Sequence, residues 1–287
     1  MSNVCLSKSG RSTLSRWGVV ATSLLSLSLL VACGSSLKQE QSSREREMRE
    51  TRERGMQMWR ARCERSGVFV HRRIEGVEGI YLINVRTRSN FGESREDQFA
   101  LDDPYGHDST GDYYILNFLR GAHHHPAGKP SPFLDAPRNG YQFVEAIDPK
   151  DGKLYRFTGR IDEPWQRDKS YLKGYTQFVA DKVPIEKRSA RYGVKFEDIS
   201  TKEERQYWIA GSSLKVVDLD TGEVLGERIG YMVDWAQGSK AGNRSPWLFA
   251  ADNACPDFFH GLPRRAPASV SQPGQTLDFV ELVLKTK

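Results

Sequence analysis

The sequence lacks the short motifs that mark the commonest enzyme active sites. It has neither an HExxH nor a paired-cysteine spacing for zinc, and it has no G-x-S-x-G turn for a nucleophilic serine. GAHHHPAGKPS is not a phosphate-binding loop, because the gap between Gly121 and Gly128 is longer than that motif allows. The stretch 102–112 is rich in acids but does not have the spacing of a calcium-binding EF-hand loop. These absences favour a protein that binds over one that catalyses.

A strong overall charge is also missing. The 287 residues contain 42 Lys and Arg against 37 Asp and Glu, so a net charge of +5 gives no argument for nucleic acid as a partner. The charges are unevenly placed, however: Lys38 to Arg73 has 11 Lys and Arg against 6 Glu, whereas Ile74 to Lys287 has 28 against 31. The basic stretch is either a solvated helix or a surface for anionic lipid head groups.

The apolar run near the start of the chain is too short for a straight transmembrane helix, which needs about 20 residues. It extends over 16 residues from Trp17 to Ala32 and follows Lys8, Arg11 and Arg16. A positive start, a short apolar run and small residues at its end form the layout of a secretory signal peptide. We expect residues 1–32 to be that peptide, and its removal would leave 39 basic against 37 acidic residues.

Leu30, Val31, Ala32 and Cys33 stand at the end of this run and resemble the lipobox of bacterial lipoproteins. The resemblance implies that the chain is cut before Cys33, that the Cys33 sulfur carries a diacylglyceryl group, and that the new amino group is often acylated, for example with palmitate. Several acyl chains together hold a protein stably on a membrane without spanning it. Gly34 stands where an Asp would favour the inner membrane, which implies the outer membrane and a periplasm-facing protein. The alternative is an uncleaved signal anchor in which Cys33 is incidental.

Cysteine is scarce, and this interpretation assigns two of the four. Cys5 would leave with the signal peptide, and Cys33 would carry the lipid. In an exported protein the remaining two, Cys63 and Cys255, are expected to form a disulfide. The long loop that it closes would stabilise the fold by about 5 kcal/mol in the chain-entropy model. Two free buried thiols are the alternative, and a catalytic thiol is disfavoured because no base stands beside either cysteine.

Residues 33–65 are expected to form a lipid-anchored helical stem. Leu37 to Arg65 is rich in strong helix formers, has no proline, and carries Glu–Arg pairs four residues apart with the acid first. A sparse apolar stripe strengthens towards its end, so the last turns should be docked. Gly55 should weaken the helix by about 1 kcal/mol relative to alanine, and the stem would span about 40 Å. The pairs are Glu40–Arg44, Glu45–Arg49 and Glu50–Arg54, and the stripe is Met48, Met56, Trp59 and Cys63.

Residues 66–287 are expected to form a single α+β domain, in which a mostly antiparallel β-sheet carries one or two short helices. The strongest signal is a pair of hairpins whose turns are rich in Asp and Gly. The expected hairpins are Tyr141–Ile147 with Lys153–Ile161 and Ser213–Leu219 with Glu223–Asp234. Further strands are expected at Val68–Arg72, Gly79–Arg86 and Leu277–Leu284, and helices after a capping box at Ser200–Glu203 and within Gln166–Val183.

Histidines and aromatic side chains supply the remaining candidate sites. His123, His124 and His125 are consecutive, and His107 stands beside Asp108 in the preceding long loop, so imidazoles and carboxylates from loops could bind zinc. Three consecutive side chains cannot all face one ion without a special turn, and a polar loop without metal is the alternative. Aromatic residues could also form a platform for a glycan. Those in loop-like or edge contexts are Trp165, Tyr171, Tyr175, Trp235 and Trp247.

Together these features predict a lipid-anchored protein of the cell envelope that binds a partner and does not catalyse a reaction. The expected partners are the membrane, through the lipid anchor, and either an envelope protein or cell-wall glycan, with no nucleic acid and no cofactor other than a possible zinc ion. The alternatives are a metal-dependent hydrolase that uses His107 and the loop His123–His125, and a protein that binds cell-wall glycan.

Overall fold

A computed structural model describes residues 18–87, 95–106, 109–122, 140–162, 177–258 and 272–287 of the chain. The chain divides into two compact units, 1–51 and 52–287. Helix α1 (Gly18–Cys63) contains the stretch 37–63 that the sequence predicts to be helical. Within the described residues we find no helical segment with the length and hydropathy of a membrane span.

The described side chains of α1 from residue 39 to residue 50 are all exposed. Among the acid-first pairs, Glu40 and Arg44 form an ion pair of 2.5 Å. Arg54 instead contacts Glu203, 149 residues away, at 3.4 Å. The helix is thus solvated from residue 39 to residue 50, as its alternation of charges predicts.

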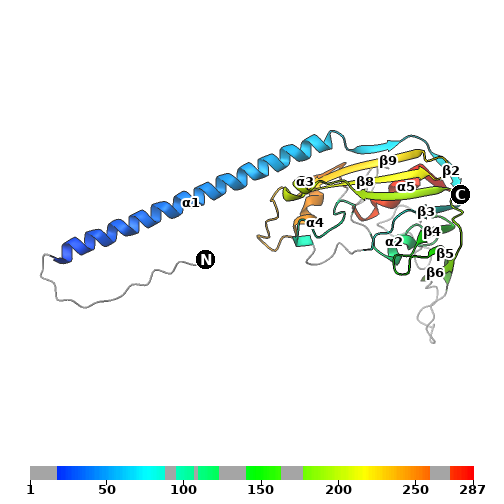
Figure 1. The fold of residues 1–287 in the computed structure, drawn as a ribbon, viewed down its shortest axis with the longest axis horizontal. Helices are drawn as coiled ribbons and strands as arrows, with labels where there is room; N and C mark the ends of the chain where they lie inside the picture. Colours follow the sequence, from blue (N-terminus) through cyan, green and yellow to red (C-terminus); the bar gives the residue numbers. More distant parts are fainter. Residues whose placement is uncertain (1–17, 88–94, 107–108, 123–139, 163–176, 259–271) are drawn as a thin grey trace, which may run out of the picture. The chain divides into compact units, whose positions relative to one another are not determined.

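The unit 52–287 is built on one nine-stranded mixed sheet. Its strands are β1 (Gly67–Val70), β3 (Gly79–Leu82), β4 (Phe143–Ile147), β5 (Leu154–Asp162), β6 (Gln177–Pro184), β7 (Tyr192–Asp198), β8 (Ile209–Asp218), β9 (Val224–Val233) and β10 (Ala254–Cys255). They follow the order β1-β9-β8-β7-β3-β4-β5-β6, with β10 also paired to β9 (Figure 1). Only β3 is parallel to its neighbours β4 and β7; the other described pairs of this sheet are antiparallel. The expected α+β class with a mostly antiparallel sheet is therefore confirmed, but beyond α1 the described residues contain four α-helices where one or two were expected.

Both predicted hairpins are present, as β4–β5 and β8–β9, and their turns have the same chemistry. In the first, the Asp148 carbonyl accepts the Gly152 N–H at 2.8 Å, and the Asp148 carboxylate accepts the Lys150 N–H at 2.8 Å. In the second, Asp218 makes the equivalent contacts with Gly222 and Asp220, at 2.7 and 3.1 Å. The glycines have φ of 70° and 75°, a region that glycine occupies without strain. Local turn chemistry therefore fixes both hairpins.

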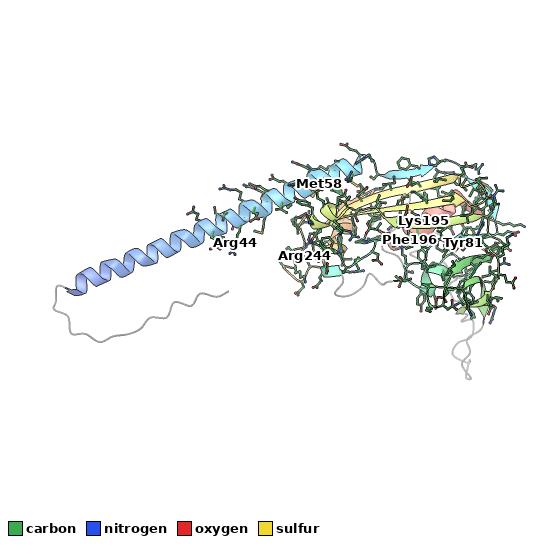
Figure 2. The ribbon with its side chains drawn as sticks, in the orientation of Figure 1. Arg44, Met58, Tyr81, Lys195, Phe196 and Arg244 are labelled. Carbon is green, nitrogen blue, oxygen red and sulfur yellow. A yellow bond between two sulfur atoms is a disulfide. The ribbon has the colours of Figure 1, made fainter. Side chains whose placement is uncertain are left out.

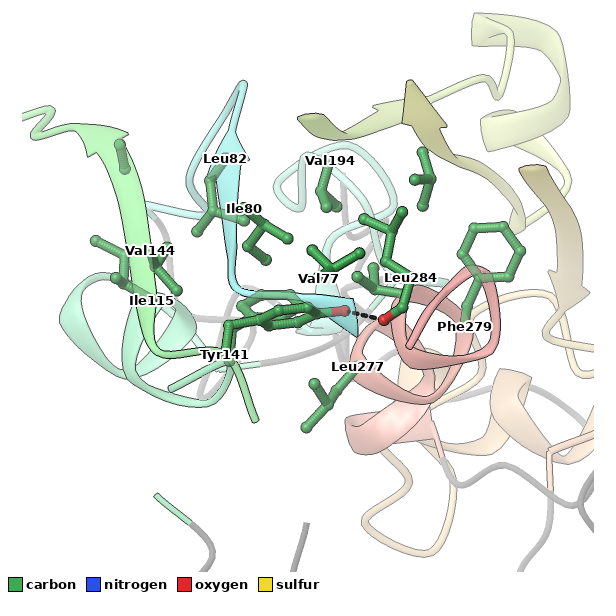
Figure 3. Close-up of a cluster of buried hydrophobic side chains, with 14 of the residues drawn as sticks. Val77, Ile80, Leu82, Ile115, Tyr141, Val144, Val194, Leu277, Phe279 and Leu284 are labelled. Carbon is green, nitrogen blue, oxygen red and sulfur yellow. Dashed lines mark hydrogen bonds between the residues drawn. The ribbon is translucent and has the colours of Figure 1, made fainter. Parts of the chain in front are cut away.

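The predicted C-terminal strand is wrong, because most of Leu277–Leu284 belongs to helix α5 (Gln275–Val283). Leu277, Val280 and Val283 are buried, whereas Asp278, Glu281 and Leu282 are not. Together with buried Phe279, which lies four residues before Val283, this spacing of three and four residues is the period of a helix, which the alternation near Leu277 and Phe279 conceals. Helix α5 joins the main apolar core against the sheet, and Tyr141 Oη donates a hydrogen bond of 2.6 Å to the Leu284 carbonyl (Figure 3).

Two further local predictions need correction. Helix α3 (Lys202–Gln206) is capped one residue later than expected, by Thr201 with Glu204 rather than by Ser200 with Glu203. Glu204 is buried and Glu203 exposed, so burial decides between two equally plausible capping boxes. The helix expected within 166–183 is wrong for its described part, which is strand β6. Elements not expected as such are strands β7 and β10, β2 (Ile74–Val77), which pairs in parallel with β11 (Leu284–Thr286), and helices α2 (Asp112–Leu116) and α4 (Pro246–Ala250).

Candidate binding surface

The last turns of α1 pack against α3 and the ends of β8 and β9. Cys63, the last residue of the helix, is joined by a disulfide to Cys255 of β10, as expected, with a Cα–Cα distance of 5.5 Å. Arg62 Nε donates to the buried carboxylate of Glu204, and this hydrogen bond raises the pKa of Arg62 above its ordinary value. Met58 lies in the same docked segment (Figure 2). A covalent bond and an ion pair to a buried carboxylate therefore hold this end of α1 in place.

Gly55 has a packing role that its helix propensity does not reveal. A Cβ atom at this position would lie 3.0 Å from Gln237 Nε2 and 3.3 Å from Tyr207 Cβ. The absence of a side chain lets α1 approach the segment after β9 closely. Gly55 therefore lowers the helix propensity of α1 relative to alanine, but it is the residue that lets the helix dock closely.

The segment that follows β9 is organised by the buried carboxylate of Asp234. Asp234 Oδ1 accepts the Ala236 N–H at 3.2 Å, and Oδ2 accepts the Gly238 N–H at 2.9 Å. The same carboxylate receives two hydrogen bonds from Arg244, at 2.6 and 3.3 Å. A bidentate guanidinium contact is both strong and directional. It fixes both ends of the segment 234–244.

Arg244, labelled in Figure 2, contacts two aromatic rings, one of them on α4. Its guanidinium carbon is 5.7 Å from the centre of the Trp235 ring and 4.8 Å from the centre of the Phe249 ring. Arg52 of α1 approaches the same indole, at 5.4 Å. We define Arg52, Trp235, Arg244, Leu248 and Phe249 as the aromatic patch.

Helix α4 turns two large apolar side chains towards solvent within this patch. Leu248 is 52% exposed and Phe249 40%, and Trp235 is 45% exposed. Trp247 and Ala250 of the same helix are buried; the Trp247 ring packs 5.1 Å from Trp208. Because Trp247 is buried, helix α4 is oriented so that Leu248 and Phe249 face solvent. Adjacent exposed apolar side chains of this size are characteristic of contact surfaces.

The aromatic patch is suited to contact and stacking rather than to acid–base chemistry. The nearest carboxylate, that of Asp234 beneath Arg244, is fully buried. It accepts hydrogen bonds from two backbone N–H groups and from Arg244. Arg244 is only 15% exposed and has its charge balanced by that acid. What faces solvent is therefore mainly two ring surfaces and an aliphatic side chain, with Arg52 at their margin.

A second polar cluster lies inside the protein. Asp103 Oδ2 accepts hydrogen bonds from Arg86 at 2.7 Å and from Ser212 at 2.9 Å, and all three residues are buried. Burial raises the pKa of Tyr105, two residues along, to about 12, so this phenol remains protonated near neutral pH. The hydrogen bonds of this cluster link separate elements of the fold. Because Ser212 is fully buried within β8, its hydroxyl is not accessible as a nucleophile.

The structure separates the residues that the sequence offers as candidate sites. Trp235 is exposed in the aromatic patch, whereas Trp247 is core, so these two do not form one glycan platform. His107 and His123–His125 lie outside the described residues, as do Trp165, Tyr171 and Tyr175; zinc binding stays a prediction. Among the described residues, no three His, Cys, Asp or Glu side chains are placed to hold a metal ion. Cys33 lies within α1, but its side chain is not among those described, so lipidation also stays a prediction.

The aromatic patch was only partly foreseeable. Trp235 stands out as an aromatic residue after a predicted strand, but its partners Arg244 and Phe249 come from different segments. The signal that could have suggested the loop is Asp234 at the end of a strand, followed by glycines at 238 and 242. No protein-family model, curated protein or solved structure matches the chain.

Proposed function

We propose that the protein is a lipid-anchored component of the bacterial cell envelope, facing the periplasm, that binds a protein partner without catalysing a reaction. The resemblance of Leu30–Cys33 to a lipobox supports the anchor. The Cys63–Cys255 disulfide supports an oxidising compartment. The observation that carries the binding role is Arg244, which a buried carboxylate holds within contact of the exposed rings of Trp235 and Phe249.

The chemistry of the aromatic patch favours a protein as the partner. Tryptophan and arginine are the side chains that contribute most at the centres of protein interfaces. Since Asp234 already balances Arg244, a partner can cover the guanidinium without burying an unpaired charge. The contacts with Arg244 also hold the rings of Trp235 and Phe249, so binding loses little side-chain entropy.

Site-specific crosslinking in intact cells tests the patch. A photoreactive phenylalanine analogue replaces Leu248 in the full chain, and a matched variant carries it at Tyr113, an exposed aromatic residue of α2. We expect a discrete crosslinked protein from position 248 and none from position 113, and we expect Trp235→Ala to abolish the product from position 248. Equal products from both positions, or a product that survives Trp235→Ala, would contradict a specific patch.

Cell-wall glycan is the second candidate ligand, because an exposed indole ring such as that of Trp235 can stack on a sugar. Sedimentation with purified cell-wall sacculi separates the two. If the wild-type chain co-sediments and Trp235→Ala does not, the patch binds glycan, and the proposal of a protein partner fails. We expect neither protein to co-sediment.

The anchor has its own test. Mass measurement of the amino-terminal peptide should show cleavage before Cys33 and a mass increase that corresponds to two or three acyl chains with glycerol. Cys33→Ser should release the protein from the membrane fraction. An unmodified Cys33 thiol or a retained segment 1–32 would refute the proposed address.

A further inference from the structure

The two edges of the main sheet are built differently. Strand β6, at one edge, carries Asp181, Lys182 and Pro184, which are residues that discourage another strand from pairing. Strand β1, at the opposite edge, has the sequence Gly-Val-Phe-Val with no charge and no proline. It runs along β9 at the margin of the sheet (Figure 1). Its Val68 and Phe69 are 47% and 42% exposed.

The register shows which backbone groups of β1 face outwards. His71 N–H donates to the Leu225 carbonyl at 2.9 Å, and the register that pairs Val70 with Gly226 continues through this contact. Hydrogen-bonded and non-bonded positions alternate in an antiparallel pair, so Phe69 faces β9 with its N–H and C=O groups. The N–H and C=O groups of Val68 and Val70 consequently point away from β9. Within the described residues, β1 has no second strand as neighbour.

Arginines flank this open edge. Arg65 precedes β1 and Arg73 follows it; both are exposed, and neither makes an ion pair within the described part of the chain. If two copies of the chain paired through β1 with Val68 opposite Val70, Arg65 of one copy would approach Arg73 of the other at both ends. Like charges at opposed positions destabilise strand pairing. The same arrangement would favour a strand with acidic residues at its ends.

We propose that β1 is a docking edge for an extended acidic segment of a partner protein, which adds to the sheet beside Val68 and Val70. The backbone groups of these two residues supply the hydrogen bonds, and the exposed side chains of Val68 and Phe69 supply apolar contact. Arg65 and Arg73 select a segment with acids at both ends and exclude a second copy of this chain. The inference rests on β1 and its flanking arginines and is independent of the aromatic patch.

Two synthetic peptides, Glu-Glu-Thr-Val-Thr-Val-Thr-Glu-Glu and the same sequence with Lys in place of Glu, test the charge selection on the purified full chain. Fluorescence anisotropy at low salt should show the Glu peptide binding at least about fivefold more tightly than the Lys peptide. The double variant Arg65→Glu with Arg73→Glu should invert this preference. Equal affinities, no binding of the Glu peptide at millimolar concentration, or an unchanged preference in the double variant would overturn the proposal.

A proline substitution tests the backbone contact. Val68→Pro removes an outward N–H but none of the hydrogen bonds to β9, whereas Val68→Thr keeps the N–H and serves as the matched control. We expect Val68→Pro to weaken binding of the Glu peptide at least about fivefold. Val68→Thr should change the affinity for this peptide by less than about twofold. Amide exchange of Val68 and Val70 should slow when the peptide binds. Equal binding by the two variants, or a dimer of the native chain that Val68→Pro dissociates, would overturn the proposal.

Discussion

Replacing Asp234 with alanine should be among the most destabilising single substitutions near the surface of this protein. The change removes a fully buried carboxylate that accepts hydrogen bonds from the Ala236 and Gly238 N–H groups and from Arg244. Removing one partner of a buried ion pair costs about 3–5 kcal/mol, because the remaining groups lose their partner without regaining water. We expect Asp234→Ala to lower the free energy of unfolding by that amount. Arg244→Ala should cost less, because the Asp234 carboxylate keeps its two backbone donors.

Urea unfolding with the disulfide intact measures this prediction. Because Asp234 and Arg244 share one contact, the double variant should lose less than the sum of the single losses, with a coupling of at least about 1 kcal/mol. Asp181→Ala, which breaks the exposed pair of Asp181 with Arg160 at 3.3 Å, is the control and should cost less than about 1 kcal/mol. A loss below about 1 kcal/mol for Asp234→Ala, or simple additivity with Arg244→Ala, would refute the role of Asp234 as the organiser of the aromatic patch.

Three further outcomes are expected. Replacing Cys63 and Cys255 with serine should lower the free energy of unfolding by about 5 kcal/mol, since the disulfide joins residues 192 apart; a urea midpoint equal to that of the oxidised wild type would contradict this. Burial alone raises the pKa of Glu145, but hydrogen bonds from Ala190, Arg156 and Ser189 outweigh it and lower the pKa below 4.5. The ionised Glu145 carboxylate should therefore stabilise the fold fully above pH 4.5, and this contribution should be lost as the pH drops through the lowered pKa. In urea titrations at acid pH, Glu145→Gln should flatten that decline. Elemental analysis of the full chain tests the zinc hypothesis for His107 and His123–His125: stoichiometric zinc that is lost when His123–His125 are changed to alanine would support the hydrolase alternative, and its absence would remove it.

The parts of the fold that could be predicted from the sequence are those that neighbouring residues determine. The β4–β5 and β8–β9 turns depend on an aspartate and a glycine four residues apart, and both elements of each hairpin follow from that turn. The sequence of helix α5 also fits a strand, because a short apolar run is compatible with either period until burial is known. Strand β6 was mistaken for part of a helix for the same reason. Its ladder with β5, from Asp162 with Gln177 to Tyr155 with Pro184, is not visible in its own sequence.

The aromatic patch shows why a site assembled from several segments escapes sequence analysis. Trp235 and Trp247 were both expected in loop-like or edge contexts, yet one is exposed and the other is buried against Trp208. Which of them faces solvent depends on how α4 rests on the core, and its neighbours in sequence do not determine this. Asp234 and Arg244 are only ten residues apart, but the loop between them has to close before they can form an ion pair.

Net charge over a stretch of sequence also proves a poor guide to the charge that a partner meets. The basic stretch Lys38–Arg73 contains Arg54 and Arg62, and both form ion pairs with acids of α3. Arg72 is likewise paired, with Glu223 at 2.7 Å. Arg65 and Arg73 are exposed at the two ends of β1 and have no such acid within the described residues. Two arginines of the stretch without such an acid thus lie at the ends of β1, where the proposed partner strand would meet both the charge and the open backbone groups.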